Sequence, residues 1–595
     1  MIHEEHKIMP QGNRTLFITL FILCCIIFGG CGQPPAANSP TAAKIEPKTT
    51  GTRGGKLTYR LTAAPKTFNY LLAEDEASIV TAFYMLTSRL VEFDHRTQKF
   101  VPGLAETWTT AADGRTVDIR LREGLKFSDG NNLTTDDVIF TLTAIYDERT
   151  KSPAFRDAML VGNKPIETKR VNDRELQMIF PKPVASAENY LVNLGVLPSH
   201  ALEADLKAGK LAEAWKINAP PQSIVASGPF VVEAATPGER IEYARNPHYW
   251  KKDETGTQLP YIDKFAIEVI PDANNTFVRL SQASLDIADR IRPTDYNELT
   301  KTPGQMRAFD VGPGLGIDHL WFNLNAADPA GKPLDNQTKR GWFADKRFRQ
   351  AVASAIDRES ITSVTLQGLA SPLHGLVSPA NKVWLSPDLA KIEYSLAKAG
   401  QLLKDAGFQK GGTAEAPVLV DAQNNPVEFT LIVPAENEPR KLMAAVIQQD
   451  LSRLGIKMQV VPIEFPAVTE RWTKSYDYDA ILLGLSQTDI EPSSYANFLL
   501  SSAPTHQWQP KQKTPATEWE ARIDKLFAEQ AVELDQTKRL ALFAEIQKIM
   551  RDEMPVIPIA ARHVVSAAHT KIGNYSPSSI LPYSLWNVDE LFIKP

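Results

Sequence analysis

The stretch VPGLAETWTTAADGRTVDIRLREGLKFSDGNNLTTDDVIFTL, residues 101–142, combines a strand-like segment with a helix-like one. Within it, TVDIRLR (116–122) alternates apolar and polar residues with the period of a half-buried strand. Thr134 and Asp137 have the spacing of a helix cap, in which both side chains bind free backbone amides. The clustered acids lack the glycine and glutamate positions of an EF-hand calcium loop. The stretch therefore predicts a strand and a capped helix, not a metal site.

The same mixture continues along the chain. Alternating or β-branched apolar runs predict strands at 56–61, 175–180, 230–235, 265–270, 427–433, 457–465 and 479–485. Apolar residues at three- and four-residue spacing predict helices at 393–408, 437–455 and 537–553. Gly407 and Gly455 suit the C-terminal ends of the first two helices. Because single hydrophobic cores stop growing at roughly 250–300 residues, this α/β chain of 595 residues is expected to form more than one domain.

All three cysteines of the chain lie within its first 31 residues. The apolar run LFITLFILCCIIF (16–28) and two glycines directly precede Cys31. As a helix this run would rise about 20 Å, short of the roughly 30 Å hydrocarbon core, so it fits a cleaved export signal better than a membrane span. The segment resembles a bacterial lipoprotein signal, although Phe28 stands where that pattern usually has leucine. We expect residues 1–30 to be a signal peptide and Cys31 to carry a lipid.

The composition beyond this segment is that of an ordinary globular protein. Hydrophobic residues make up 43% and charged residues 23%, and the net charge of −5 is too weak to indicate a nucleic-acid partner or a polybasic membrane surface. Residues 31–55 are rich in Pro, Ala, Thr and Gly without an apolar period, which predicts a lipid anchor and a flexible, solvated tether. The folded part is expected to begin near Lys56.

Common catalytic signatures are absent from the sequence. It contains no HExxH, GxSxG or GxxxxGK[ST] pattern, and no cysteine–histidine cluster follows Cys31. A hydrolase that uses two distant carboxylates would leave no spacing signature and stays a distant alternative. We therefore predict no catalytic residue, no metal and no cofactor.

The chain as a whole resembles family 5 of the bacterial extracellular solute-binding proteins, the peptide-, dipeptide- and nickel-binding receptors of ATP-binding-cassette (ABC) importers. The stretch 101–142 is similar to the family signature, and the resemblance covers 56–595. Further landmarks follow in the family's order: GPFVV (228–232), ARNPHYWKK (244–252), WFNLN (321–325), FADKRFRQAVASAIDRESI (343–361), IQQDLSRLGIKMQVV (447–461) and YDYDAILLGLSQTDIEP (476–492).

The resemblance implies a two-lobed α/β fold of the periplasmic-binding-protein type (type II, large form with an extra subdomain), with a hinge between lobes that close on a solute. The implied limits are lobe I at 56–312 plus 558–595, its extra subdomain at about 86–205, and lobe II at 313–557. Two chain crossings, near 311–318 and 554–560, would form the hinge. The glycines of the first crossing permit either hinge motion or a tight turn, and they are Gly312, Gly314 and Gly316.

The resemblance also indicates a ligand segment after the strand 479–485. Peptide-binding relatives carry a Trp there, then three residues on an Asp that pairs with the peptide amino terminus, then an Asp- or Glu-Pro step. Glu491 and Pro492 match the step, a leucine replaces the Trp, and Thr488 stands where the Asp is expected. A one-residue bulge would restore Asp489 to this role; without it the amine-binding charge is absent. The ligand-binding residues predicted in this segment are Leu485, Ser486, Thr488 and Asp489.

Four further residues are weaker candidates for the ligand site. Arg440 lies where relatives place basic residues that meet a ligand carboxylate, or it is a surface arginine near a helix start. Phe465 occupies the place of a family Trp, or it is a core aromatic. Trp321 and Asn323 follow the first crossing and would face the solute.

The sequence therefore predicts a lipid-anchored receptor that captures a peptide or peptide-like solute and delivers it to an ABC permease and its ATPase. The alternatives are a sensor or chaperone-like binding protein of the same fold, or a receptor for a sugar derivative or metal chelate. We expect a monomer, exported and held by its lipid at the outer face of the cytoplasmic membrane or within the periplasm or cell envelope. Closure on the solute would create the shape that a permease recognises.

Overall fold

The computed structural model describes residues 44–595 except 303, 336, 414–415 and 488. One sheet of twelve strands runs through this described part. Its strands are β1 (Lys56–Leu61), β8 (Phe230–Thr236), β9 (Arg240–Arg245), β10 (Lys264–Val269), β11 (Ile287–Asp289), β12 (Met306–Pro313), β13 (Ile317–Phe322), β14 (Ala370–Pro372), β17 (Glu428–Pro434), β18 (Lys457–Ile463), β19 (Ala480–Leu485) and β20 (Val556–His569). Their order is β18-β17-β19-β13-β20-β11-β1-β10-β9-β8, and β12 and β14 also pair with β20.

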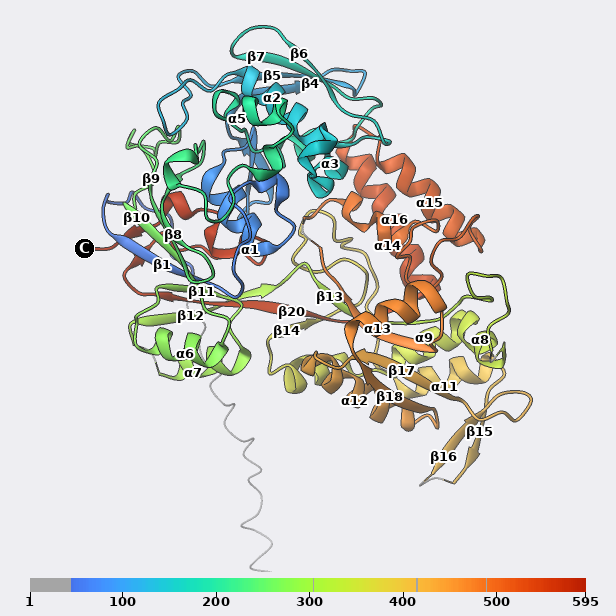
Figure 1. Ribbon diagram of the computed structural model, residues 1–595. Coiled ribbons are helices and arrows are strands. Elements are labelled where there is room, and N and C mark those ends of the chain that lie inside the picture. The colour runs from blue at the N-terminus through green and yellow to red at the C-terminus, as the bar shows by residue number, and fades with distance from the viewer. Residues whose placement is uncertain (1–43, 303, 336, 414–415, 488) are drawn as a thin grey trace, which may run out of the picture. The chain divides into compact units, whose positions relative to one another are not determined.

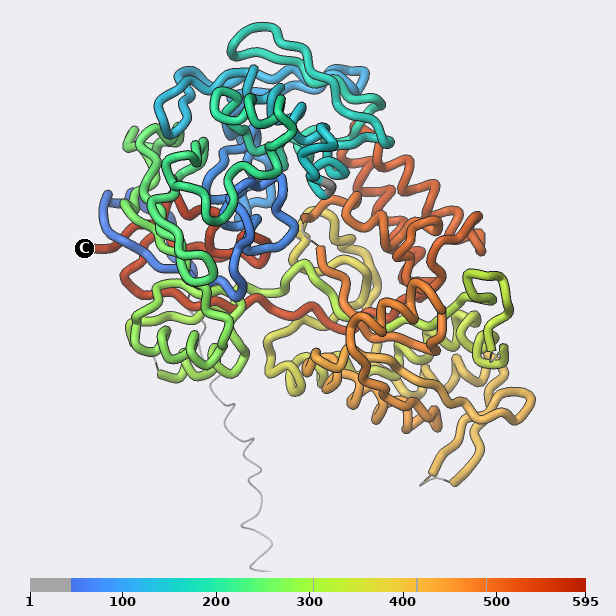
Figure 2. Tube along the Cα trace, viewed as in Figure 1, coloured from blue at the N-terminus to red at the C-terminus, as the bar shows by residue number. Residues whose placement is uncertain are grey.

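The long strand β20 belongs to both lobes, as Figures 1 and 2 show. Its residues 556–562 pair with β13 and β14, which are strands of lobe II. Residues 563–569 pair with β12, and within them 566–568 also pair with β11, both strands of lobe I. The second connection between the lobes is therefore a continuous strand whose pairing partners change between Arg562 and His563. The domain limits inferred from the sequence stay predictions.

Lobe I carries a second, four-stranded sheet in the order β4-β5-β7-β6. Two of its strands, β4 and β5, come from the stretch 101–142, and α2 follows them in the chain. The strand and the helix expected in this stretch are confirmed as β5 and α2. The Thr134 hydroxyl accepts a hydrogen bond from the amide of Asp136, and the Thr134 amide donates to the Asp137 carboxylate at 2.9 Å. The other elements of lobe I, outside the twelve-stranded sheet, are β2 (Val91–Asp94), β3 (Lys99–Pro102), β4 (Ala105–Thr110), β5 (Thr116–Leu121), β6 (Glu167–Arg170), β7 (Glu175–Ile179), α1 (Glu76–Ser78), α2 (Thr135–Tyr146), α3 (Pro153–Met159), α4 (Glu188–Leu191), α5 (Ser199–Lys207), α6 (Ala273–Ser281) and α7 (Pro293–Lys301).

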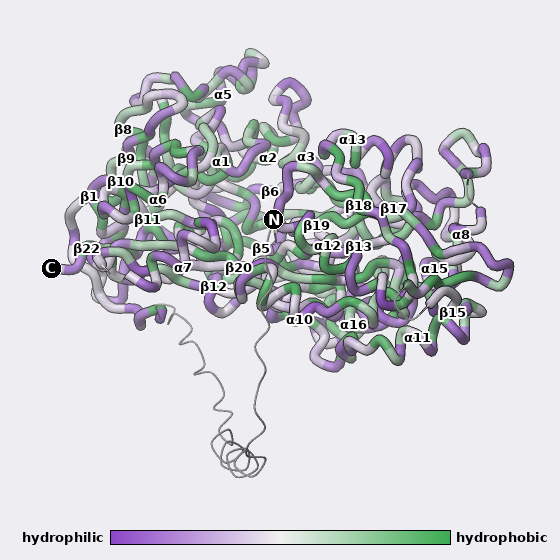
Figure 3. The backbone as a smooth tube through the Cα atoms, turned by 90° about the horizontal axis from the view of Figure 1, so that it is seen from below, coloured by the Kyte–Doolittle hydropathy of each residue, from purple (hydrophilic) through white to green (hydrophobic). Residues whose placement is uncertain are grey.

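Lobe II buries its central strand β13 on both faces. Leu320 and Phe322 point to one apolar core and Ile317 and Trp321 to another, as the two-residue period of a strand requires. In Figure 3, hydrophobic and hydrophilic residues are interleaved around the strands labelled β13, β17, β18 and β19. The surrounding elements are α8 (Gln337–Ala344), α9 (Lys346–Ala355), α10 (Arg358–Ser360), α11 (Leu396–Asp405), α12 (Glu438–Ser452), α13 (Phe465–Glu470), α14 (Ala496–Leu499), α15 (Glu518–Gln530), α16 (Gln536–Glu553) and the hairpin of β15 (Gln409–Gly412) with β16 (Pro417–Val420).

The expected element boundaries hold with local exceptions. Gly407 and Gly455 have φ angles of 93° and 80°, which confirms their predicted place at helix ends. The helix expected from 393 begins at Leu396, because the Ser395 side chain caps it by accepting the amide of Lys398. The strand expected over 457–465 ends at Ile463, because the proline after Phe465 starts a helix there.

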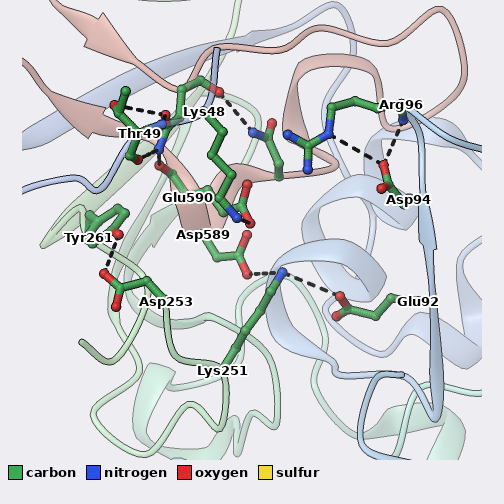
Figure 4. Close-up of polar contacts among 12 residues, drawn as sticks. Lys48, Thr49, Glu92, Asp94, Arg96, Lys251, Asp253, Tyr261, Asp589 and Glu590 are labelled. Carbon is green, nitrogen blue, oxygen red and sulfur yellow. Dashed lines mark hydrogen bonds and ion pairs between the residues drawn. The ribbon is translucent and has the colours of Figure 1, made fainter. Parts of the chain in front are cut away.

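Residues 46–54 are bonded to lobe I near the paired strands β21 (Ile572–Gly573) and β22 (Phe592–Ile593), although most of them remain exposed to solvent. The amide of Thr49 donates to the Asn574 side chain at 2.8 Å, and Lys48 pairs with Glu590 at 2.7 Å, as Figure 4 shows. Glu46 pairs with both Arg307 and Lys594 at 2.7 Å. These contacts use charges and backbone groups, so the segment docks without any apolar period.

We expect Gly51→Ala to loosen this docked segment. A Cβ at position 51 would lie 2.7 Å from carbons of the Tyr261 ring, closer than van der Waals contact allows. Hydrogen–deuterium exchange should then be faster at the Thr49 amide, while the rest of lobe I keeps its protection. Gly341→Ala is the matched control, because no atom lies within 4 Å of its Cβ position. Equal exchange at Thr49 in parent and Gly51→Ala would contradict the docking.

Candidate ligand-binding site

A cavity of about 590 Å³ lies between the two lobes, within the usual range of small-molecule sites. Lobe I supplies one wall from the β2–β3 hairpin, the residues before it, and the extra subdomain. Lobe II supplies the opposite wall from the segment after β19 and from helices α15 and α16. The lining segments fall within 83–100, 157–158, 184–193, 489–497, 527–539 and 580–586.

The β2–β3 hairpin gives the cavity an aromatic wall through Phe93, His95 and Phe100. The His95 ring stacks on Trp586 at 5.3 Å between centroids, and its Nδ1 lies 2.9 Å from the Ser578 hydroxyl. Burial, together with the nearby positive charge of an arginine, lowers the pKa of His95 to about 3. The imidazole is therefore neutral at physiological pH and acts as a polar, uncharged part of the wall.

The same hairpin holds the lobes together at its tip. Gln98 adopts a left-handed conformation, with φ of 54°, and its side chain is buried against lobe II. Its Nε2 donates to the carbonyl of Ala380 at 2.7 Å, and its Oε1 accepts the amide of Lys382 at 3.0 Å. On another side of the cavity, the amide of Ala185 donates to the carbonyl of Ala531 at 3.1 Å. The structure thus shows lobes in contact around the cavity.

Glu491 and Arg539 form an ion pair within the lobe II wall. Arg539 Nη2 lies 2.8 Å from Glu491 Oε2, and both residues are buried. The Arg539 guanidinium also donates to the Gln530 carbonyl and stands 4.8 Å from the centre of the Trp384 ring. These two opposite charges satisfy one another, so the pair contributes little net charge to the cavity.

Asp489 is the acid of this wall that lacks a cation. Its Oδ1 accepts the backbone amide of Glu491 at 2.9 Å, and no ion pair to it occurs among the described residues. Asp489 is an exposed residue that lines this cavity, and the cavity is partly open to solvent. Burial, with a smaller contribution from the charge of Glu491, raises the pKa of Asp489 to about 6. Tyr84 and Tyr495 lie close enough for the Asp489 charge to raise their pKa further.

Of the seven predicted ligand-binding residues that the structure describes, one, Asp489, lines this cavity. Ser486 is exposed and Leu485 is half-buried against a lobe II core. Thr488 and the predicted lipidation site Cys31 lie outside the described residues.

The other four predicted residues lie away from the cavity. Trp321 is fully buried and donates to the Tyr478 hydroxyl at 3.3 Å. Asn323 is fully buried too and donates to two backbone carbonyls. Arg440 binds the buried carboxylate of Asp318 at 2.8 Å, and Phe465 is half exposed at the start of α13. Their role in ligand binding stays a prediction that this arrangement does not support.

The hinge glycines also differ from one another. Gly312 has a φ of 93° and follows a β-bulge in β12, opposite Val564 of β20. Gly314 and Gly316 do not adopt a left-handed conformation. The amide of Gly314 donates to the Arg562 carbonyl at 2.9 Å. The hinge role of all three stays a prediction.

Sequence reasoning missed most of the cavity wall, including Arg89, His95, Arg539 and Trp586. Each lies in an ordinary strand, helix or loop pattern, and the fold alone brings them together. The part of the chain that the structure describes holds no group of three or more His, Cys, Asp or Glu side chains placed to bind a metal. Every helix in that part is too short or too polar to cross a membrane.

The comparisons agree with this architecture. A family model described as bacterial extracellular solute-binding proteins, family 5 Middle, matches residues 99–507. The chain is 29% identical to a probable ABC transporter-binding protein of Deinococcus radiodurans, covering 87% of this chain and 88% of that protein. It is 26% identical to a dipeptide-binding protein of Escherichia coli, covering 90% and 93%. The structure of the Bacillus subtilis oligopeptide-binding protein AppA with a nonapeptide matches with 25% identity and a TM-score of 0.64, covering 92% of this chain and all of that chain. The chain therefore belongs to family 5 of the bacterial extracellular solute-binding proteins and has the two-lobed fold of that family.

Proposed function

We propose that this protein is the receptor of an ABC importer and that it captures a peptide or peptide-like solute in the cavity between its lobes. The observation that carries the proposal is Asp489, an acid without a cation in a cavity between the lobes that is lined in part by aromatic rings. The names of its relatives, which bind dipeptides or oligopeptides, support the same solute class.

Asp489 is the proposed partner of the solute's amino terminus. A charge in an enclosed site is unfavourable unless it is paired, so an ammonium group would relieve the burial that raises the pKa of this acid. The neighbouring acid Glu491 is already bound to Arg539 and is not free for this role. The aromatic wall opposite would cover the apolar parts of the solute.

Binding and closure are coupled in this proposal. The wall that contacts the solute and the tip that contacts lobe II belong to one hairpin, β2–β3. A solute that fits the wall would stabilise the closed arrangement, which the permease would then recognise. The protein would act as a monomer without catalysis, metal or cofactor, exported by residues 1–30 and held at the membrane by a lipid on Cys31.

The direct test is native mass spectrometry of the protein as purified. We expect a bound mass that fragmentation identifies as a short peptide, and an equimolar tripeptide library should exchange into the emptied protein. A retained sugar derivative or metal chelate, with no uptake from the tripeptide library, would contradict the peptide proposal and favour an alternative solute.

Asp489→Asn should separate stability from binding. The pKa of Asp489 is raised from 3.8 to about 6, so the folded protein favours the protonated acid more than the unfolded chain does. The free energy of unfolding therefore falls as the pH rises from 3.8 through 6 and the acid ionises. The ligand-free Asn variant should therefore unfold at the same temperature as the parent near pH 4. At pH 7 it should be more stable by roughly 1 kcal/mol, since water in the cavity screens part of the penalty.

Binding should change in the opposite direction. Tripeptide affinity of the parent should rise between pH 5 and pH 7 as the acid ionises, whereas Asp489→Asn should lose roughly tenfold or more and show no such rise. Asp477→Asn, at an exposed position outside the cavity, is the matched control. Parent-like affinity of Asp489→Asn at pH 7, measured by calorimetry, would rule out the amine-binding role.

Gln98→Ala should weaken closure without removing a wall residue. The variant loses two hydrogen bonds between lobes, so its solute-bound form should keep a larger radius of gyration than the parent in small-angle scattering. Gln177→Ala, on the exposed face of β7, removes an amide without touching lobe II and should behave as the parent does. An identical radius of gyration for parent and Gln98→Ala would show that the bridge does not hold the lobes together.

A further inference from the structure

Arg89 borders the cavity from lobe I, directly before the β2–β3 hairpin. Its side chain is 14% exposed, and its guanidinium donates no hydrogen bond to any described residue. The Nη1 atom is fully enclosed without a partner. Buried polar groups are nearly always hydrogen-bonded, and a guanidinium offers five donors, so this arrangement requires an explanation.

The surroundings of Arg89 only partly balance its charge. The nearest carboxylate is Glu92, at 3.8 Å from Nη2, which is beyond hydrogen-bond distance. Glu92 is shared with Lys251, at 3.5 Å, and Lys251 is held in turn by Asp589 at 2.9 Å (Figure 4). Burial opposes the charge of Lys251, but these acids outweigh it and raise its pKa, so Lys251 stays a competing cation.

Two aromatic rings also lie beside the Arg89 guanidinium. Its guanidinium carbon lies 5.2 Å from the centre of the Tyr84 ring and 5.5 Å from that of Phe83. Such faces stabilise a cation but accept no ordinary hydrogen bond. Arg89 and Asp489 both line this cavity, Arg89 from lobe I and Asp489 from lobe II.

We infer that Arg89 recognises a carboxylate of the solute and thereby selects peptides with a free carboxyl terminus. Guanidinium and carboxylate form short, charge-assisted hydrogen bonds, which would supply the acceptor that the ligand-free site lacks. A solute with an amine for Asp489 and a carboxylate for Arg89 would satisfy both walls at once. The inference rests on the proposed peptide-binding function and adds to it the chemistry of the solute's second end.

The test compares two equimolar tripeptide libraries of the same sequences, one with free carboxyl termini and one with carboxyl-terminal amides. The parent should retain free acids over amides by roughly ten- to hundredfold in competition, read by native mass spectrometry. Arg89→Met should retain both libraries equally, and Arg89→Lys should keep part of the preference. Arg120→Met, an exposed arginine on β5 outside the cavity, should behave as the parent does.

The parent's own preference is a readout that does not depend on whether a variant folds. Equal retention of acids and amides by the parent, or an undiminished preference in folded Arg89→Met, would overturn the inference and leave the peptide proposal standing. Retention of neither library by the parent would overturn both.

Discussion

Both lobes bond to the same strand, β20, and the position of the cavity depends on this shared pairing. One part of the strand is hydrogen-bonded to β13 and β14, and the next part to β11 and β12. Neither lobe can separate from its portion of β20 without breaking several backbone hydrogen bonds, and each of these is unfavourable to lose in a buried sheet. Any relative motion of the lobes would have to be accommodated where the partners change. The bulge and the left-handed Gly312 lie beside this point, so the predicted hinge role of Gly312 would place the bending there.

The charges around the cavity fall into two classes that suggest different roles. Glu491 and Arg539 pair with each other inside lobe II, so they hold the wall in place whether or not a solute is present. Asp489 and Arg89 lie on opposite lobes, and among the described residues neither has an oppositely charged side chain within hydrogen-bond distance. Incomplete pairing destabilises the ligand-free site and makes it responsive to a solute that carries the missing charges.

Local sequence patterns predicted the strands and helix ends, because these depend on interactions between residues that are close in the chain. Alternation identified β5 and most of the main sheet, and the capping pair Thr134 and Asp137 located the start of α2. Asp489 was found because the adjacent Glu491–Pro492 step marks its segment. Arg89 and His95 carry no such mark, because their place in the cavity depends on contacts between residues hundreds of positions apart. The structure places Trp321 in a lobe II core, because both faces of β13 are buried and an apolar run alone does not distinguish a core position from a position in a cleft.

The docking of residues 46–54 on lobe I limits how far lobe I could lie from a lipid on Cys31. Fifteen positions separate Cys31 from Glu46, which fully extended would span about 50 Å. If Cys31 is lipidated, the docked residues can lie no farther than this from the bilayer surface. Confinement to this layer would raise the effective concentration of the receptor near a permease in the same membrane. A low affinity between the two proteins would then be enough for solute delivery. Lobe I would then be the lobe held near the membrane, and lobe II would be the one that changes its distance from the membrane on closure.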